Sequence, residues 1–87
     1  GDLAKLPNIG AIGEKVGLIG INTAEELKKV GSKEAFIKLY SLEGDTCFNT
    51  LCALEGAIQG ILWHNLSDEA KADLKRFFEE VTKKYEK

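Results

Sequence analysis

The sequence is poor in the residues on which metal sites and most catalytic centres depend. Its 87 residues include a single histidine, His64, and two cysteines, Cys47 and Cys52, which form no Cys-x-x-Cys pair. A zinc site takes about four ligands, so we expect no metal. No Ser/His/Asp arrangement and no phosphate loop of the Walker type is present, so we expect neither an enzyme nor a cofactor. Two cysteines are too few for a small domain that is stabilised by disulfides, and we interpret both as small buried hydrophobic residues.

Long apolar runs and an excess of one charge are also absent. The chain has 12 basic and 14 acidic residues and a formal net charge of −2. No run reaches the roughly 18 apolar residues of a membrane helix, and the start of the chain lacks the basic and apolar regions of a signal peptide. We therefore predict a cytoplasmic protein without membrane contact. Gly1 is compatible with the remnant of a cleaved tag, and we assign it no role.

What the chain does contain is typical of one small globular domain. Hydrophobic residues make up 44% of it and charged residues 30%, with one proline. We predict a single domain over residues 1–87, a size that argues against a large catalytic cleft between domains. Since no segment shows the alternation of a strand, we predict an all-α fold, a compact bundle of about five helices.

Capping residues predict where these helices begin and end. Thr23 and Glu26 form a capping box, which predicts a helix from Ala24 to about Val30. Gly31 ends this helix, and Ser32 caps the next one. The later helices, the last two capped by Thr46 and Ser67, are predicted over 33–40, 47–63 and 68–84.

The two longest predicted helices differ in their apolar surface. The last helix carries one apolar stripe and should pack on one side only. The helix over 47–63 has large apolar residues on one side and small ones on another. The small residues are Ala53, Gly56, Ala57 and Gly60. Because small residues let a neighbouring helix approach closely, we predict that this helix is central and largely buried.

The amino end resembles a helix-hairpin-helix motif, in a SAM-like arrangement. Residues 6–23 have apolar positions at helical spacing, interrupted by a Pro-x-x-Gly turn. The resemblance implies that backbone N–H groups near Gly10 and Ile12 hold a DNA phosphate, with Lys5 and Lys15 as the nearby cations. Alternatively, the glycines serve only to make tight turns. Asn8 stands where the usual motif has its first glycine.

Three segments together extend this likeness to most of the chain. Residues 6–10, residues 19–27 and residues 51–60, the last followed by Trp63, resemble the TfoX C-terminal domain family over residues 3–74. This resemblance implies a small bacterial, non-enzymatic helical domain, linked by the family name to transcriptional regulation of competence. Longer members carry a separate amino-terminal domain, so a stand-alone copy need not regulate competence.

Two side chains of the predicted central helix have both a structural and a functional interpretation. Glu55 falls among apolar positions, where a carboxylate is costly unless it is paired. We interpret it as a structural polar anchor that caps a neighbouring helix or accepts N–H groups near residues 8–13, and the alternative is a perturbed acid in a pocket. Trp63 closes the core or, alternatively, stacks on a nucleobase.

These observations favour a regulatory or adaptor module that contacts another protein or a second copy of itself, as a homodimer. The alternative is weak, sequence-nonspecific DNA binding through the hairpin amides, which the lack of a basic surplus disfavours.

Overall fold

The computed structural model describes residues 13–43 and 47–85, which are helical throughout apart from short connections. The elements are α1 (Gly13–Leu18), α2 (Ala24–Val30), α3 (Ser32–Glu43), α4 (Phe48–Gln59), the 3-10 turn η2 (Trp63–Asn65) and α5 (Asp68–Tyr85). No strand occurs in these two segments. The prediction of an all-α fold with about five helices is confirmed.

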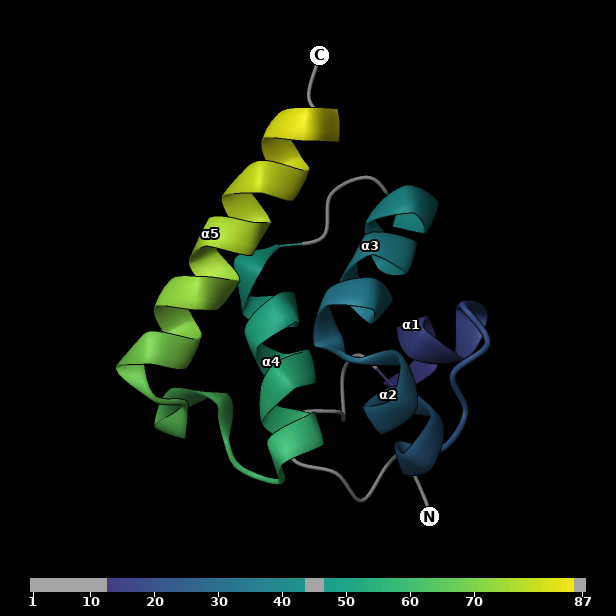
Figure 1. Cartoon of the computed structure of the whole chain (residues 1–87). Helices are drawn as coiled ribbons and strands as arrows, with labels where there is room; N and C mark the ends of the chain where they lie inside the picture. The colour runs from purple at the N-terminus through teal and green to yellow at the C-terminus, as the bar shows by residue number, and fades with distance from the viewer. Residues whose placement is uncertain (1–12, 44–46, 86–87) are drawn as a thin grey trace.

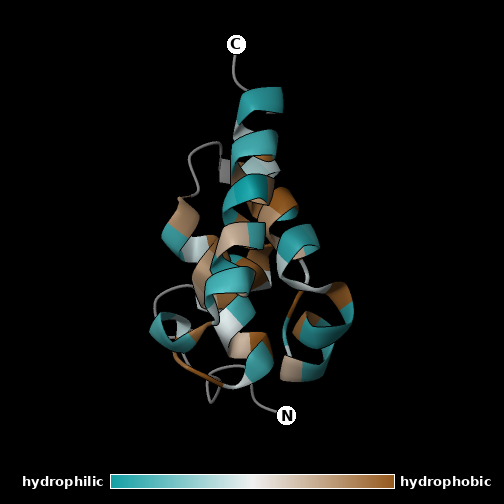
Figure 2. Ribbon diagram, turned by 60° about the vertical axis from the view of Figure 1, so that its left-hand side comes forward, coloured by the Kyte–Doolittle hydropathy of each residue, from teal (hydrophilic) through white to brown (hydrophobic). Residues whose placement is uncertain are grey.

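Helix α4 lies at the centre of the packing, between α3 and α5 (Figure 1). It also contacts α2 and η2, whereas α1 packs against α3. Leu51, Leu54 and Ala57 of α4 are fully buried, and Gly56 is buried beside them. The predicted central, largely buried helix is therefore confirmed. Helix α5, in contrast, lies at the surface: Figure 2 shows that its outer face is hydrophilic along most of its length.

Aromatic rings join α3, α4 and α5 at one end of the core. The fully buried ring of Phe36 lies 5.8 Å from that of Phe78 and 6.4 Å from that of Phe77, measured between centroids. Phe48, in the first turn of α4, meets Phe78 edge-on at 5.5 Å. Such tilted and edge-on pairs are the favourable arrangements for aromatic rings. The single apolar stripe of α5 thus packs on one side, as predicted.

Helix α4 ends earlier than predicted, at Gln59 instead of Trp63. Gly60 is left-handed, with φ 76° and ψ 26°. The N–H of Ile61 donates to the carbonyl of Gly56 at 2.9 Å, and that of Gly60 to Ala57 at 3.2 Å. These two bonds form a Schellman motif, which terminates a helix at a glycine. The prediction was wrong because Gly60 acts as a helix stop and is not part of a small-residue face.

The junction between α2 and α3 contains the predicted capping box. The N–H of Glu26 donates to the Thr23 hydroxyl at 3.1 Å, and the Glu26 carboxylate accepts from the N–H of Asn22 at 3.3 Å. Gly31 then connects the two helices alone: its N–H donates to the carbonyl of Leu27, and its carbonyl accepts from the N–H of Ala35.

Ser32 does not cap α3, contrary to the prediction. It is the first residue of α3, and its hydroxyl donates to Glu55 of α4. Ser67 behaves as predicted, since its hydroxyl accepts the N–H of Ala70 at 3.1 Å at the start of α5. The predicted cap at Thr46 lies outside the described residues, and Cys47, next to it, makes no side-chain cap for α4.

Candidate functional site

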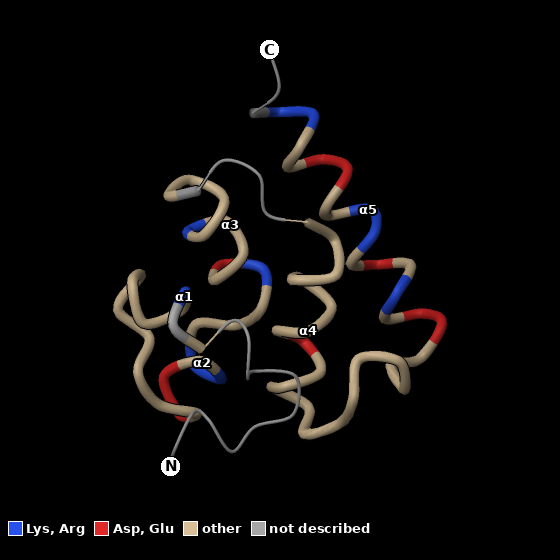
Figure 3. Tube along the Cα trace, turned by 180° about the vertical axis from the view of Figure 1, so that it is seen from behind, with Lys and Arg blue, Asp and Glu red and all other residues tan. Residues whose placement is uncertain are grey.

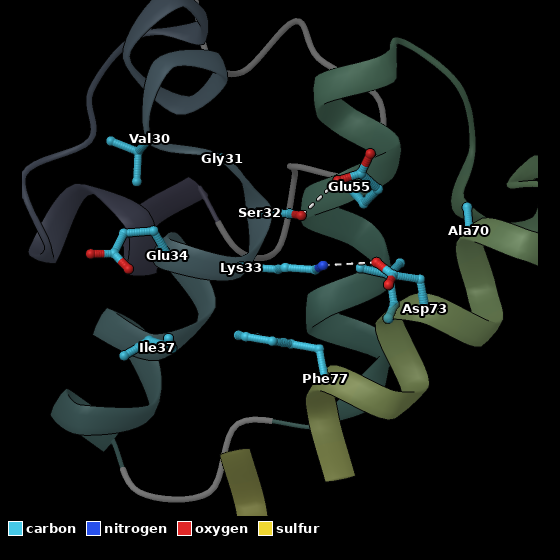
Figure 4. Close-up of a pocket in the computed structure, with 11 residues that line it drawn as sticks. Val30, Gly31, Ser32, Lys33, Glu34, Ile37, Glu55, Ala70, Asp73 and Phe77 are labelled. Carbon is cyan, nitrogen blue, oxygen red and sulfur yellow. Dashed lines mark hydrogen bonds and ion pairs between the residues drawn. The ribbon is translucent and has the colours of Figure 1, made fainter. Parts of the chain in front are cut away.

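A groove of about 510 Å³ opens where the start of α3 faces α4 and the first half of α5 (Figure 4). Residues 30–34 form one wall, Ala70, Asp73 and Phe77 of α5 form the other, and Glu55 of α4 lies at the upper end. The walls therefore combine apolar surface with charged groups from segments up to 40 residues apart in sequence. A concave surface of this mixed kind is the usual form of a binding site.

The carboxylate of Glu55 joins α3 to α4 at one end of the groove. Its Oε1 accepts the hydroxyl of Ser32 at 2.6 Å, and its Oε2 accepts the side-chain amide of Gln59 at 2.6 Å. Ser32 is only 5% exposed and is the one buried polar side chain in the described part of the chain. The carboxylate thus lies at the N-terminus of a neighbouring helix, as in the structural interpretation, although it contacts a hydroxyl there. Residues 8–12, the other suggested partners, lie outside the described residues.

An ion pair crosses the groove below Glu55. The ammonium of Lys33 lies 2.8 Å from Asp73 Oδ2 and 5.5 Å from the centroid of the Phe77 ring. The hydrogen bond from Lys33 and its charge, with a smaller contribution from Arg76 at 3.5 Å, lower the pKa of Asp73. Both side chains of the Lys33–Asp73 pair are about half exposed, so water and salt screen their attraction. This contact therefore positions the side chains more than it stabilises the fold.

The lining of the groove is acidic as far as the structure describes it. Among the described residues it holds the three carboxylates of Glu34, Glu55 and Asp73 against the one ammonium of Lys33. Glu55 is also the only charged residue of α4, which is otherwise uncharged along its length in Figure 3. An anionic ligand such as a DNA phosphate is therefore disfavoured in this groove.

Of the predicted phosphate site, the structure describes Lys15 alone, and this residue does not line the groove. Lys15 is an exposed residue of α1, whereas Lys5, Gly10 and Ile12 lie outside the described residues. Sequence reasoning missed Lys33 and Asp73, which meet only through the packing of α3 against α5. No local pattern signals a contact between residues 40 positions apart.

Comparisons with known proteins place the chain in a family. The family model for the TfoX C-terminal domain matches residues 1–78. The chain belongs to the TfoX C-terminal domain family. Its predicted membership is confirmed, over slightly more of the chain than the predicted 3–74.

Two solved structures resemble this TfoX C-terminal domain closely. An uncharacterised protein from Listeria monocytogenes, in a triclinic crystal form, is 44% identical with a TM-score of 0.90, over 93% of both chains. A protein of unknown function from the same organism, in a tetragonal form, is also 44% identical with a TM-score of 0.87, over 90% of this chain and 98% of that one. No curated protein matches the chain.

The two cysteines of this TfoX C-terminal domain differ in exposure. Cys52 is buried, as predicted, but Cys47 is exposed at the start of α4, so that part of the prediction was wrong. The Thr50 hydroxyl and backbone N–H groups in the first turn of α4 lower the pKa of the Cys47 thiol, whereas burial raises that of Cys52. Within the described segments, no three His, Cys, Asp or Glu side chains are grouped to hold a metal ion.

The other feature singled out in the sequence, Trp63, packs against the edge of the core. It is partly buried against the core, and its ring stacks on that of His64 with centroids 3.9 Å apart and planes 27° apart. The backbone of η2 is tied to α5, because the Lys71 ammonium donates to the carbonyl of His64 at 3.1 Å. None of the helices that the structure describes is long and apolar enough to span a bilayer.

Proposed function

We propose that this TfoX C-terminal domain is a non-enzymatic regulatory or adaptor module, related to TfoX-type transcriptional regulators, that acts by binding another protein. The observation that carries the proposal is the groove of about 510 Å³ between α3 and α5, with its apolar walls and its acidic charge. Protein interfaces combine an apolar centre with a polar rim in the same way. The cytoplasm is the corresponding location for such a regulator.

The closest approach to a catalytic arrangement in the groove is the contact of Ser32 with Glu55, and its geometry argues against catalysis. Ser32 is 5% exposed, so a substrate has little access to its hydroxyl. The carboxylate already accepts a second hydrogen bond, from Gln59. A serine nucleophile needs a base beside it and an open approach to the substrate, and the second is missing here.

Photo-crosslinking from inside the groove tests this proposal. A benzoylphenylalanine replaces Glu34, an exposed residue of the groove, or Glu79, an exposed residue of α5 outside its lining. In cells of the source organism we expect one protein to crosslink at position 34 and not at position 79. Ala70→Trp, which fills the groove, should abolish that adduct. Adducts that are identical at the two positions, or that survive Ala70→Trp, would contradict the proposal.

The partner can also be a second copy of the chain. Leu18 and Leu42 are large apolar residues that are 71% and 55% exposed, and Leu42 borders a second, shallower hollow on α3. A mass of two chains, measured by light scattering at high concentration, would identify the second copy as the partner. A strict monomer would exclude the homodimer.

DNA binding is the second candidate, and the turn after α1 favours it. Gly20, with φ 87°, and the bond from the Ile21 N–H to the Val16 carbonyl at 3.0 Å form a tight turn between α1 and α2, of the kind that joins the helices of a helix-hairpin-helix motif. If hairpin amides hold phosphates, log affinity for duplex DNA falls linearly with log salt, and Lys15→Glu weakens binding. No detectable binding at low salt would dismiss this candidate.

A further inference from the structure

Glu55 is a carboxylate whose partners in the described structure are all neutral. The Ser32 hydroxyl and the Gln59 amide each donate one hydrogen bond to it. Lys33, the cation in the described lining of the groove, is instead paired with Asp73 at 2.8 Å and lies over the Phe77 ring. Hydrogen bonds from neutral groups orient a carboxylate but do not balance its charge. A partly buried negative charge therefore lies at the end of a groove that is acidic overall.

The carboxylate keeps room for a further ligand. A carboxylate offers about four lone-pair sites, two on each oxygen, and can accept a bidentate arginine. Ser32 occupies one site on Oε1 and Gln59 one site on Oε2. The described residues therefore leave one acceptor site on each oxygen, which is the pattern that a forked guanidinium requires.

The surface next to Glu55 suits the rest of an arginine side chain. Val30 and Ala70, which are partly buried, lie on either side of Glu55 in Figure 4, and the buried Leu74 also lines the groove. An arginine places its aliphatic stem on such apolar surface while its charged end reaches a polar group. Apolar walls that end in an anion are thus complementary to this side chain.

We propose that the groove receives an arginine side chain presented by a segment of a partner protein, with the guanidinium bound to Glu55. This inference rests on the proposed function, because it names the chemistry of the partner that binds there. Arginine fits better than lysine, since an ammonium is a point charge that cannot contact both oxygens through a planar fork.

Titration of the 87-residue chain with small probes, followed by amide chemical shifts, tests the proposal. The probes are N-acetyl-arginine N-methylamide and its uncharged isostere N-acetyl-citrulline N-methylamide. We expect the arginine probe to shift the amides of residues 31–34 and 70–74 with an affinity of about millimolar, and the citrulline probe to bind about tenfold more weakly. Equal affinities would overturn the proposal. Methylguanidinium that binds with the same affinity as the arginine probe would also overturn it, because the groove would then bind a free small cation and not an arginine side chain.

Two variants locate the interaction at Glu55. Glu55→Gln keeps an acceptor for Ser32 and removes the charge, and we expect it to weaken the arginine probe about tenfold. Glu34→Gln removes the same charge from the same groove, and we expect a change of less than about twofold. Equal effects of the two variants would overturn the assignment. If the arginine probe does not bind while the crosslink at position 34 is still observed, only the arginine inference is contradicted. Absence of the crosslink would contradict the proposed function itself.

Discussion

Gly31 joins α2 to α3 in one residue, and its replacement by alanine should destabilise the fold through the backbone alone. Its φ of 89° and ψ of 157° lie in a region that is essentially restricted to glycine. Apart from its two chain neighbours, no heavy atom of the described residues lies within 4 Å of the Cβ that alanine would add, so the cost does not come from a clash with them. Holding alanine in this conformation costs about 1–3 kcal/mol, and its lower entropy in the unfolded chain offsets about 0.4–1 kcal/mol of that. From the middle of each range, the net loss is about 1–2 kcal/mol.

Thermal unfolding followed by helical circular dichroism measures this loss. For a domain of this size, each 1 kcal/mol lowers Tm by about 4–8 °C, so we expect Gly31→Ala to lower Tm by about 5–15 °C. The matched control is Gly17→Ala in α1. Gly17 has no positive φ, and among the described residues its added Cβ would meet Asn22 Oδ1 at 3.8 Å, an ordinary contact. Since alanine favours a helix by up to about 1 kcal/mol over glycine, Tm should stay equal or rise. A Gly31→Ala protein as stable as the wild type would refute the backbone argument.

Three further predictions concern other side chains. Glu55→Ala leaves the buried hydroxyl of Ser32 without its acceptor and should destabilise the fold by about 1–3 kcal/mol, and unchanged thermal unfolding would rule out the anchoring role. Iodoacetamide near neutral pH should modify Cys47, with its exposed, lowered-pKa thiol, and leave the buried second cysteine intact, so intact-protein mass spectrometry should show one adduct. Because the folded pKa of Asp73 is lowered, its pairing stabilises the fold above the unfolded pKa of about 4 and is lost as pH falls through the folded value. Lys33→Met should therefore unfold at a slightly lower denaturant concentration than the wild type at pH 7, and the gap should close at low pH.

Local signals in the sequence were sufficient to predict most helix starts and stops. The capping box of Thr23 and Glu26, the stop at Gly31 and the cap at Ser67 all depend on residues within four positions of each other. Such contacts form in the helix itself, so their spacing along the chain determines them. The buried side of α4 was also predictable, because small residues recur at helical spacing.

The remaining errors and omissions depend on tertiary packing. A glycine at position 60 suits either a small-residue face or a left-handed helix end, and the packing of Ile61 after the turn decides between them. Serine is a residue type typical of helix caps, yet the Ser32 hydroxyl donates to Glu55, 23 residues away. The groove depends on the approach of α3 to α5, for which no sequence pattern exists.

The hydrogen bond between Ser32 and Glu55 links occupancy of the groove to the stability of the whole molecule. The same carboxylate fastens α3 to α4 and lines the groove, so a ligand that binds it needs both helices in place. A ligand of this kind binds the folded chain only, and its stabilisation grows as RT ln(1 + [L]/Kd). At about 100 times Kd this amounts to roughly 2.7 kcal/mol, which is large for a domain of 87 residues. Binding of the partner should therefore raise the melting temperature of the chain, and collections of peptides can be screened for this shift without any assay of activity.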